Sequence, residues 1–279
     1  SVTVSGTIPD FDAPRPAVQM EASLSPQLID FAGLPESYKA VAPVTVKAEV
    51  EYQQSPQAVT IRSLSVDTAA GALSGTARLA LEQPAGQSTV KVSAERIALD
   101  LLSRLGESPV TIASTADVQI EATWPRMEWK QGEVSAVVSL QSKGGPSTDT
   151  RIPMSGRLRA SGTMDRAVVN IDRLEAREAR ATGRVTLAGL QQEQPRLGGQ
   201  VQVQASDLAR LGVPQIHGAA TADVSLGGTL KAPVVRASVV ADNLRYEKYE
   251  GIAVKADAEY TGDTVTIPSA VNNYDEHTL

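Results

Sequence analysis

The sequence contains no cysteine and only two histidines. Without cysteine there can be no disulfide, no thiolate metal ligand and no thiol nucleophile. The histidines, His217 and His277, have no carboxylate or cysteine companion at metal-ligand spacing, so we expect both to be exposed residues of a loop or tail. The sequence therefore predicts no metal site and no cofactor.

Large aromatic side chains are too few to fill a closed core in a chain of this length. The 279 residues include two Phe, two Trp and six Tyr, and the apolar residues are largely Ala, Val and Leu, which suit strands but add little bulk. Both tryptophans lie in the segment Trp124–Trp129. This segment predicts a strand end or a hairpin, and its amphipathic rings would also suit a lipid interface.

Charge and motifs indicate neither nucleic-acid binding nor catalysis. The formal net charge is −6, and basic residues alternate with acidic ones instead of forming a stripe. The Gly-Gly pairs at 144–145, 198–199 and 227–228 lack the Lys-Ser or Lys-Thr of a phosphate loop and predict hairpin turns. Ser155 and Ser161 lack a nucleophile elbow, and we find no carboxylate pair for a polysaccharide-cleaving β-repeat enzyme. We therefore expect a protein that is not an enzyme and has no nucleic-acid partner.

No apolar run approaches the ~20 residues that a membrane-spanning helix needs. The first residues do not form a signal peptide, and the pattern there is that of a strand already in progress. We therefore expect a fragment of a longer protein, with any anchor or export signal outside the sequence.

Alternation of apolar and polar residues is the dominant pattern of the chain. About fourteen segments show it, and turns rich in Gly and Pro separate them. Side chains two residues apart on a strand share a face, so the pattern predicts antiparallel sheet with one apolar and one wet face. The clearest apolar sets are Val44, Val46, Ala48, Val50 and Tyr52; Val118, Ile120, Ala122 and Trp124; and Ile252, Val254, Ala256, Ala258 and Tyr260.

Two short phrases recur along the chain. One is an alternating strand that soon meets Leu or Ile, at 18–23, 90–95, 201–206 and 237–242; the other leads from 59–64 to Gly75 and from 169–174 to Gly183. Three segments with helical spacing, 25–33, 98–106 and 206–212, each end in Gly and predict short helices. We expect one elongated repeat region, 1–279, with approximate units 1–106, 107–212 and 213–279.

One run carries a family resemblance. From Leu226 a Gly-Thr-Leu-Lys-Ala-Pro phrase leads into a strand that ends in Asn-Leu244, and a fainter copy runs from Pro195 to Leu208. The run resembles the recurring element of the AsmA/TamB-like proteins of diderm bacteria, and the Ala/Val-rich, cysteine-free composition is similar over essentially the whole chain. The sequence departs from full-length members in lacking the N-terminal membrane helix and a clear C-terminal partner-binding domain.

The resemblance implies a curled sheet, the β-groove or β-taco, in the periplasm. The parent protein would be anchored in the inner membrane and would meet a partner at the outer membrane. The apolar concave face would carry phospholipid acyl chains between the two membranes, and a role in assembling outer-membrane proteins is also implied.

The residues themselves lead to a compatible prediction. An apolar sheet face must be covered by a second sheet, by helices, by curling or by a ligand, and three short helices cannot cover about fourteen strands. We therefore predict an all-β fold, an elongated curled antiparallel sheet of repeated strand units with a few short helices. Small inward residues such as Ala48, Ala77 and Ala122 would leave room for an acyl chain. The predicted lipid-binding lining is Val46, Val50, Ile61, Leu79, Leu81, Val92, Val118, Ile120, Val138, Leu140, Ile171, Leu187, Val203, Val224, Val239 and Val254.

The alternative comes from a different class of protein. A structural β-sandwich stalk or adhesin-like repeat would pack its apolar faces on one another and would hold no ligand.

Overall fold

The computed structural model of the chain describes residues 2–7, 16–25, 41–82, 86–105, 108–145, 147–148, 150–211, 214–262 and 264–273. Strands make up 74% of the chain and helix is almost absent, which confirms the predicted all-β fold class. Within each unit the long strands are antiparallel to their neighbours and form a curled sheet that does not close on itself.

The chain divides into two compact units, Ser1–Pro153 and Met154–Leu279, which we call unit 1 and unit 2. The approximate units 1–106, 107–212 and 213–279 predicted from the sequence are defined by recurring sequence patterns and not by compactness. That division remains a prediction.

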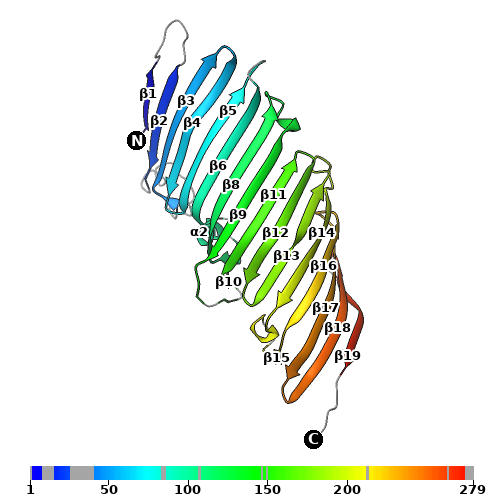
Figure 1. Ribbon diagram of the computed structural model, residues 1–279. Coiled ribbons are helices and arrows are strands. Elements are labelled where there is room, and N and C mark those ends of the chain that lie inside the picture. Colours follow the sequence, from blue (N-terminus) through cyan, green and yellow to red (C-terminus); the bar gives the residue numbers. More distant parts are fainter. Residues whose placement is uncertain are drawn as a thin grey trace. The chain divides into compact units, whose positions relative to one another are not determined.

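Unit 1 is a meander in which each long strand pairs with the next one along the chain (Figure 1). Alternating strands joined by short turns give this topology directly. Two strands of two residues, β7 and β10, form a separate parallel pair. The elements are β1 (Val2–Thr7), β2 (Ala17–Leu24), β3 (Val44–Gln54), β4 (Gln57–Thr68), β5 (Gly71–Ala80), β6 (Gln87–Ala98), α2 (Leu99–Leu105), β7 (Thr111–Ile112), β8 (Ser114–Pro125), η2 (Trp129–Gln131), β9 (Glu133–Ser142) and β10 (Arg151–Ile152).

Unit 2 repeats the meander, with the order β11, β12, β13, β14, β16, β17, β18, β19. The short strand β15 pairs with the end of β17. The elements are β11 (Met154–Thr163), β12 (Arg166–Ala176), β13 (Ala179–Ala188), β14 (Arg196–Ala205), η3 (Leu208–Leu211), β15 (Ile216–His217), β16 (Ala220–Gly228), β17 (Pro233–Tyr246), β18 (Tyr249–Thr261) and β19 (Thr264–Asn273).

The repeated phrase at 59–64 and 169–174 encodes a β-bulge. Ile61 of β4 pairs with Ala77 of β5, and Leu64 pairs with Gly75. Between these two pairs β4 advances by three residues while β5 advances by two, so β4 contains one extra residue. The pairing of β12 with β13 shifts in the same way between Ile171 and Leu174. The extra residue returns Leu to the face that Ile occupies, which explains why this spacing departs from strict alternation.

A second bulge follows the other repeated phrase in β6 and β17. The pairing shifts between Ala94 and Ile97 and between Ala241 and Leu244. Arg96 and Asn243, just before Ile97 and Leu244, adopt positive φ angles of 52° and 57°. The exposed Arg96 N–H donates to Asp117 Oδ1 at 2.8 Å, which holds the first of these bulges against the neighbouring strand.

Two of the three predicted short helices are present. The segment predicted at 98–106 contains α2, and the segment at 206–212 contains the 3₁₀ turn η3. The helix predicted at 25–33 lies almost wholly outside the described residues.

Fully buried side chains are few and small because each unit is a single layer of sheet. The buried apolar residues are mainly alanines, such as Ala58, Ala80 and Ala116. Among the described residues, the long strands pack mainly on their neighbours within the layer, and the sheet outside that layer consists of the two-residue strands β7 and β10. The closed sandwich of the alternative prediction is therefore not the arrangement within a unit.

Candidate functional site

The register places apolar side chains in continuous rows on one face of unit 1. Residues paired directly across antiparallel strands point to the same side. One row runs without interruption through every long strand from β2 to β9, and the two rows beside it are equally free of charge. The first row consists of Ala22, Val46, Val66, Leu73, Ala94, Val118 and Val138; the next consists of Met20, Ala48, Leu64, Gly75, Val92, Ile120 and Ala136. We call this the apolar face of unit 1.

Unit 2 has an apolar face of the same construction. One row runs from β11 to β18 through Gly156, Leu174, Ala181, Val203, Ala222, Val239 and Ala256. The row beside it runs through Leu158, Ile171, Gly183, Val201, Val224, Ala237 and Ala258.

The predicted lining residues all share the apolar face of the unit to which they belong. Those in unit 1 run from Val46 in β3 to Leu140 in β9, and those in unit 2 from Ile171 in β12 to Val254 in β18. Leu81 lies one residue past the end of β5, and its N–H donates to Gln57 O at 3.0 Å, which continues the same alternation. The structure thus brings these residues together on a common face within each unit.

The apolar faces are only partly covered. The lining residues are half-buried by their neighbours in the sheet, and Ile120 is 37% exposed. In unit 1 the face is open on the first two strands, where Val4 is 62% and Met20 43% exposed and the two residues pair directly. Apolar side chains in this state leave a surface that a ligand or partner would cover favourably.

One end of the unit 2 apolar face is covered from within the chain. Ala220, Ala241 and Leu244 form a small buried cluster beneath η3 and β15. Leu208 and Val254 pack against this cluster. Val254, one of the predicted lining residues, therefore belongs to the covered end, whereas Val203 and Val224 belong to the middle of the sheet.

The opposite face of each unit is polar and carries ion pairs between neighbouring strands. Lys91 Nζ lies 3.0 Å from Glu121 Oε1 in unit 1, and Arg236 Nε lies 3.2 Å from Glu259 Oε2 in unit 2. These side chains are largely solvated, so each pair contributes little to stability. Their effect is to keep this face wet and to oppose slippage of the register.

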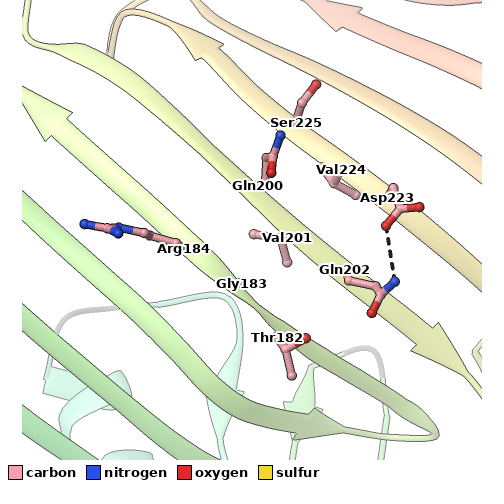
Figure 2. A pocket seen from close by; sticks show the side chains of 9 residues that line it. All are labelled: Thr182, Gly183, Arg184, Gln200, Val201, Gln202, Asp223, Val224 and Ser225. Carbon is pink, nitrogen blue, oxygen red and sulfur yellow. Dashed lines mark hydrogen bonds between the residues drawn. The ribbon is translucent and has the colours of Figure 1, made fainter.

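A hollow in unit 2 opens among side chains of this polar face (Figure 2). It has a volume of about 580 Å³ and lies across β13, β14 and β16. Gln202 Nε2 donates to Asp223 Oδ1 at 3.3 Å inside it. The residues that line it are Thr182, Gly183, Arg184, Gln200, Val201, Gln202, Asp223, Val224 and Ser225.

Sequence reasoning did not find this hollow. Alternation predicts which side chains share the polar face, but the curvature that hollows it arises from the paired backbones. Two smaller hollows, each of about 240 Å³, also lie mainly among polar-face residues, one around Lys47 in unit 1 and one around Arg236 in unit 2. Both are lined by charged side chains from neighbouring strands together with small apolar residues.

The perturbed carboxylates have structural roles. Hydrogen bonds from Ser269, at 2.7 Å, and from Ser238 hold the pKa of Asp257 below its ordinary value. The Asp207 pKa is lowered first by the backbone N–H of Ala209, which donates to Asp207 Oδ1 at 3.1 Å in the first turn of η3. His217 Nδ1 lies 3.7 Å from Asp207 Oδ2, a partner that the sequence did not reveal. Within the described part of the chain no group of His, Asp and Glu has the geometry of a metal site.

Comparison with known proteins returns no relative. No family model matches the chain, and no curated protein or solved structure matches it either. Among the described residues, no helix has the length and apolar character needed to cross a membrane.

Proposed function

We propose that the chain is a non-enzymatic lipid-binding segment whose apolar sheet faces hold the acyl chains of phospholipids. The observation that carries the proposal is the set of uninterrupted apolar rows on a sheet that is a single layer within each unit, with only the two-residue strands β7 and β10 forming sheet outside that layer in the described residues. Burying such a surface is favourable by about 25 cal/mol per Å². An extended acyl chain can lie along a row and provide that cover.

The composition of the rows favours a mobile, chain-like ligand over a rigid one. The rows consist of glycine, alanine and aliphatic side chains, and large rings are absent from their middle, as in the row through Val201 and Val224. Small side chains leave space above the sheet, and their lack of directional polar groups lets a chain slide along it. Neighbouring strands are ~4.8 Å apart, so a row across seven strands offers a path of roughly 29 Å.

The cellular setting belongs to the same proposal. The resemblance to AsmA/TamB-like proteins supports a periplasmic location, with the parent anchored in the inner membrane and phospholipid passing to the outer membrane. A contribution to the assembly of outer-membrane proteins is compatible with the same surface. The apolar faces would act collectively, so no single lining residue is expected to be indispensable.

Native mass spectrometry of the purified chain tests the proposal. Phospholipid should co-purify, and the delipidated protein should take up a fluorescent phospholipid whether or not a chelator is present, because no metal takes part. A folded protein, judged by circular dichroism, that neither carries nor takes up lipid would instead favour the ligand-free stalk. In that case another protein surface would have to cover the apolar faces.

A further inference from the structure

The turn between β8 and β9 presents two large apolar side chains to solvent. Met127 is 56% exposed and Trp129 is 54% exposed, and both lie outside the strands. Their exposure is therefore not a consequence of an unpaired strand edge or of a sheet face. We call residues 125–132 the β8–β9 tip.

The tip is held in one conformation by its own hydrogen bonds and by the neighbouring turn. The Ser88 hydroxyl, which is fully buried, donates to Arg126 O and accepts from Ala80 N–H at 3.0 Å. Glu128 N–H donates to Pro125 O at 2.9 Å, and Gly132 N–H donates to Trp129 O at 3.1 Å. A fixed turn presents its exposed side chains without the entropy cost of ordering them on contact.

The tip carries charges of both signs next to its exposed apolar residues in the sequence. Arg126 Nη2 lies 3.2 Å from Glu128 Oε1, and Gln131 Nε2 donates to Glu128 Oε2 at 2.6 Å, so the carboxylate is neutralised and satisfied. Lys130 Nζ lies 5.9 Å from the centre of the Trp129 ring. An exposed indole and an exposed thioether on one turn that also carries charges of both signs match the mixed apolar and zwitterionic chemistry of a phospholipid headgroup layer.

We propose that the β8–β9 tip is a membrane-docking element that seats Trp129 and Met127 in the headgroup layer of a phospholipid bilayer. A stable protein partner would need to cover about 800 Å² per side, more than two side chains on one turn provide. A bilayer receives a small tip without such a surface, because the indole and thioether leave water by entering the interface.

The β8–β9 tip lies next to the end of the apolar face of unit 1. Trp124 pairs with Ser88 on the apolar face of unit 1, in the last row before the tip. A docked tip therefore brings the end of this apolar face to the membrane surface, where lipid could enter or leave it. This consequence rests on the proposed function, whereas the docking itself does not.

Co-sedimentation with vesicles of phosphatidylethanolamine and phosphatidylglycerol tests the docking. The wild-type chain should bind, and the double variant Met127→Ser/Trp129→Ser should bind about tenfold more weakly, because it loses the apolar groups that enter the interface. The matched control is Leu230→Ser/Val240→Ser, which changes two exposed apolar side chains, 51% and 38%, that lie in the β16–β17 turn and on the polar face. The control should bind as the wild type does. Absence of wild-type binding, or equal binding by the tip variant, overturns the proposal.

A second readout uses wild-type protein and one conservative variant. Brominated phospholipids in the vesicles should quench the tryptophan emission, and Trp129→Phe should remove most of that quenching. Unchanged quenching in Trp129→Phe would assign the lipid contact to Trp124 and overturn the proposal. A photo-crosslinker placed at position 129 that traps protein instead of lipid would also overturn it.

Lipid carried on the apolar faces is measured separately by native mass spectrometry. A chain that docks on vesicles but carries no phospholipid would contradict the proposed function and support the docking. A chain that carries phospholipid but does not dock would support the proposed function and contradict the docking.

Discussion

Val201 and Val224 pair directly across β14 and β16 on the apolar face of unit 2. The adjacent residues in each strand, Gln202 and Asp223, pair on the other face and share a hydrogen bond of 3.3 Å inside the polar hollow. A step of one residue therefore separates two environments, one suited to acyl chains and one to water. This separation makes the proposed function testable with single substitutions.

A carboxylate on the apolar face should impair lipid binding. In the Val203→Asp variant the new charge would have to be desolvated beside acyl chains, so phospholipid uptake should fall by about tenfold or more. The matched control is Gln200→Asp, which places the same group on the wet face between Arg184 and Ser225 and should leave uptake near the wild-type value. Equal uptake by both variants would mean that the apolar face of unit 2 does not contact the lipid. Fluorescent phospholipid titration measures the difference.

Glycine at position 183 is needed for the close approach of β13 and β14. A Cβ at Gly183 would overlap Gln200 O and lie 2.7 Å from Val201 Cα, and both atoms are backbone. Gly183→Ala should therefore destabilise the protein by about 1–3 kcal/mol. Gly227→Ala is the control, because a Cβ there meets nothing within 4 Å. Urea denaturation compares the variants, and equal midpoints would contradict the structure at this pair of strands.

The bulge in β17 depends on a left-handed residue. Asn243 has a φ of 57°, which a β-branched side chain adopts only with strain. Asn243→Val should cost about 1–3 kcal/mol of unfolding free energy, while Asn243→Gly should be close to neutral. Thermal unfolding followed by circular dichroism gives the comparison. A well-tolerated valine would mean that the bulge is absent or lies elsewhere.

Acid should remove the stabilising effect of Asp257. The Ser269 hydroxyl, and after it Ser238, lowers the pKa of this carboxyl, so the folded state favours the ionised form. The associated stability is present above the ordinary carboxyl pKa and is lost as the pH falls through the lowered value. Asp257→Asn should therefore be less stable than wild type at neutral pH, and the gap should narrow as acid protonates the wild-type carboxyl. In NMR titrations of Asp257, Ser269→Ala should move its pKa back up, and an unmoved pKa would contradict the assignment.

The faces of the sheet could be predicted from the sequence because alternation depends only on strand geometry. Every lining residue from Val46 to Val254 lies on the expected side of its strand for this reason. The bulges were not predicted. The sequence does contain a signal for them, because at Ile61–Leu64 and Ile171–Leu174 one apolar residue follows another after three positions instead of two. The polar hollow could not be predicted, since it depends on how far each paired strand twists. Nor could the hydrogen bond from the buried Ser88 hydroxyl to Arg126 O in the β8–β9 tip, which joins residues 38 positions apart in the sequence.

The most direct test of the central claim is photo-crosslinking at neighbouring positions in one strand. A crosslinking residue at 203, or at 120 in unit 1, should trap phospholipid in the presence of vesicles. The same residue at 202 or 119, on the opposite face, should trap none. Equal crosslinking from both faces, or from neither, would show that the apolar faces are not the lipid-binding surface, even with the fold unchanged.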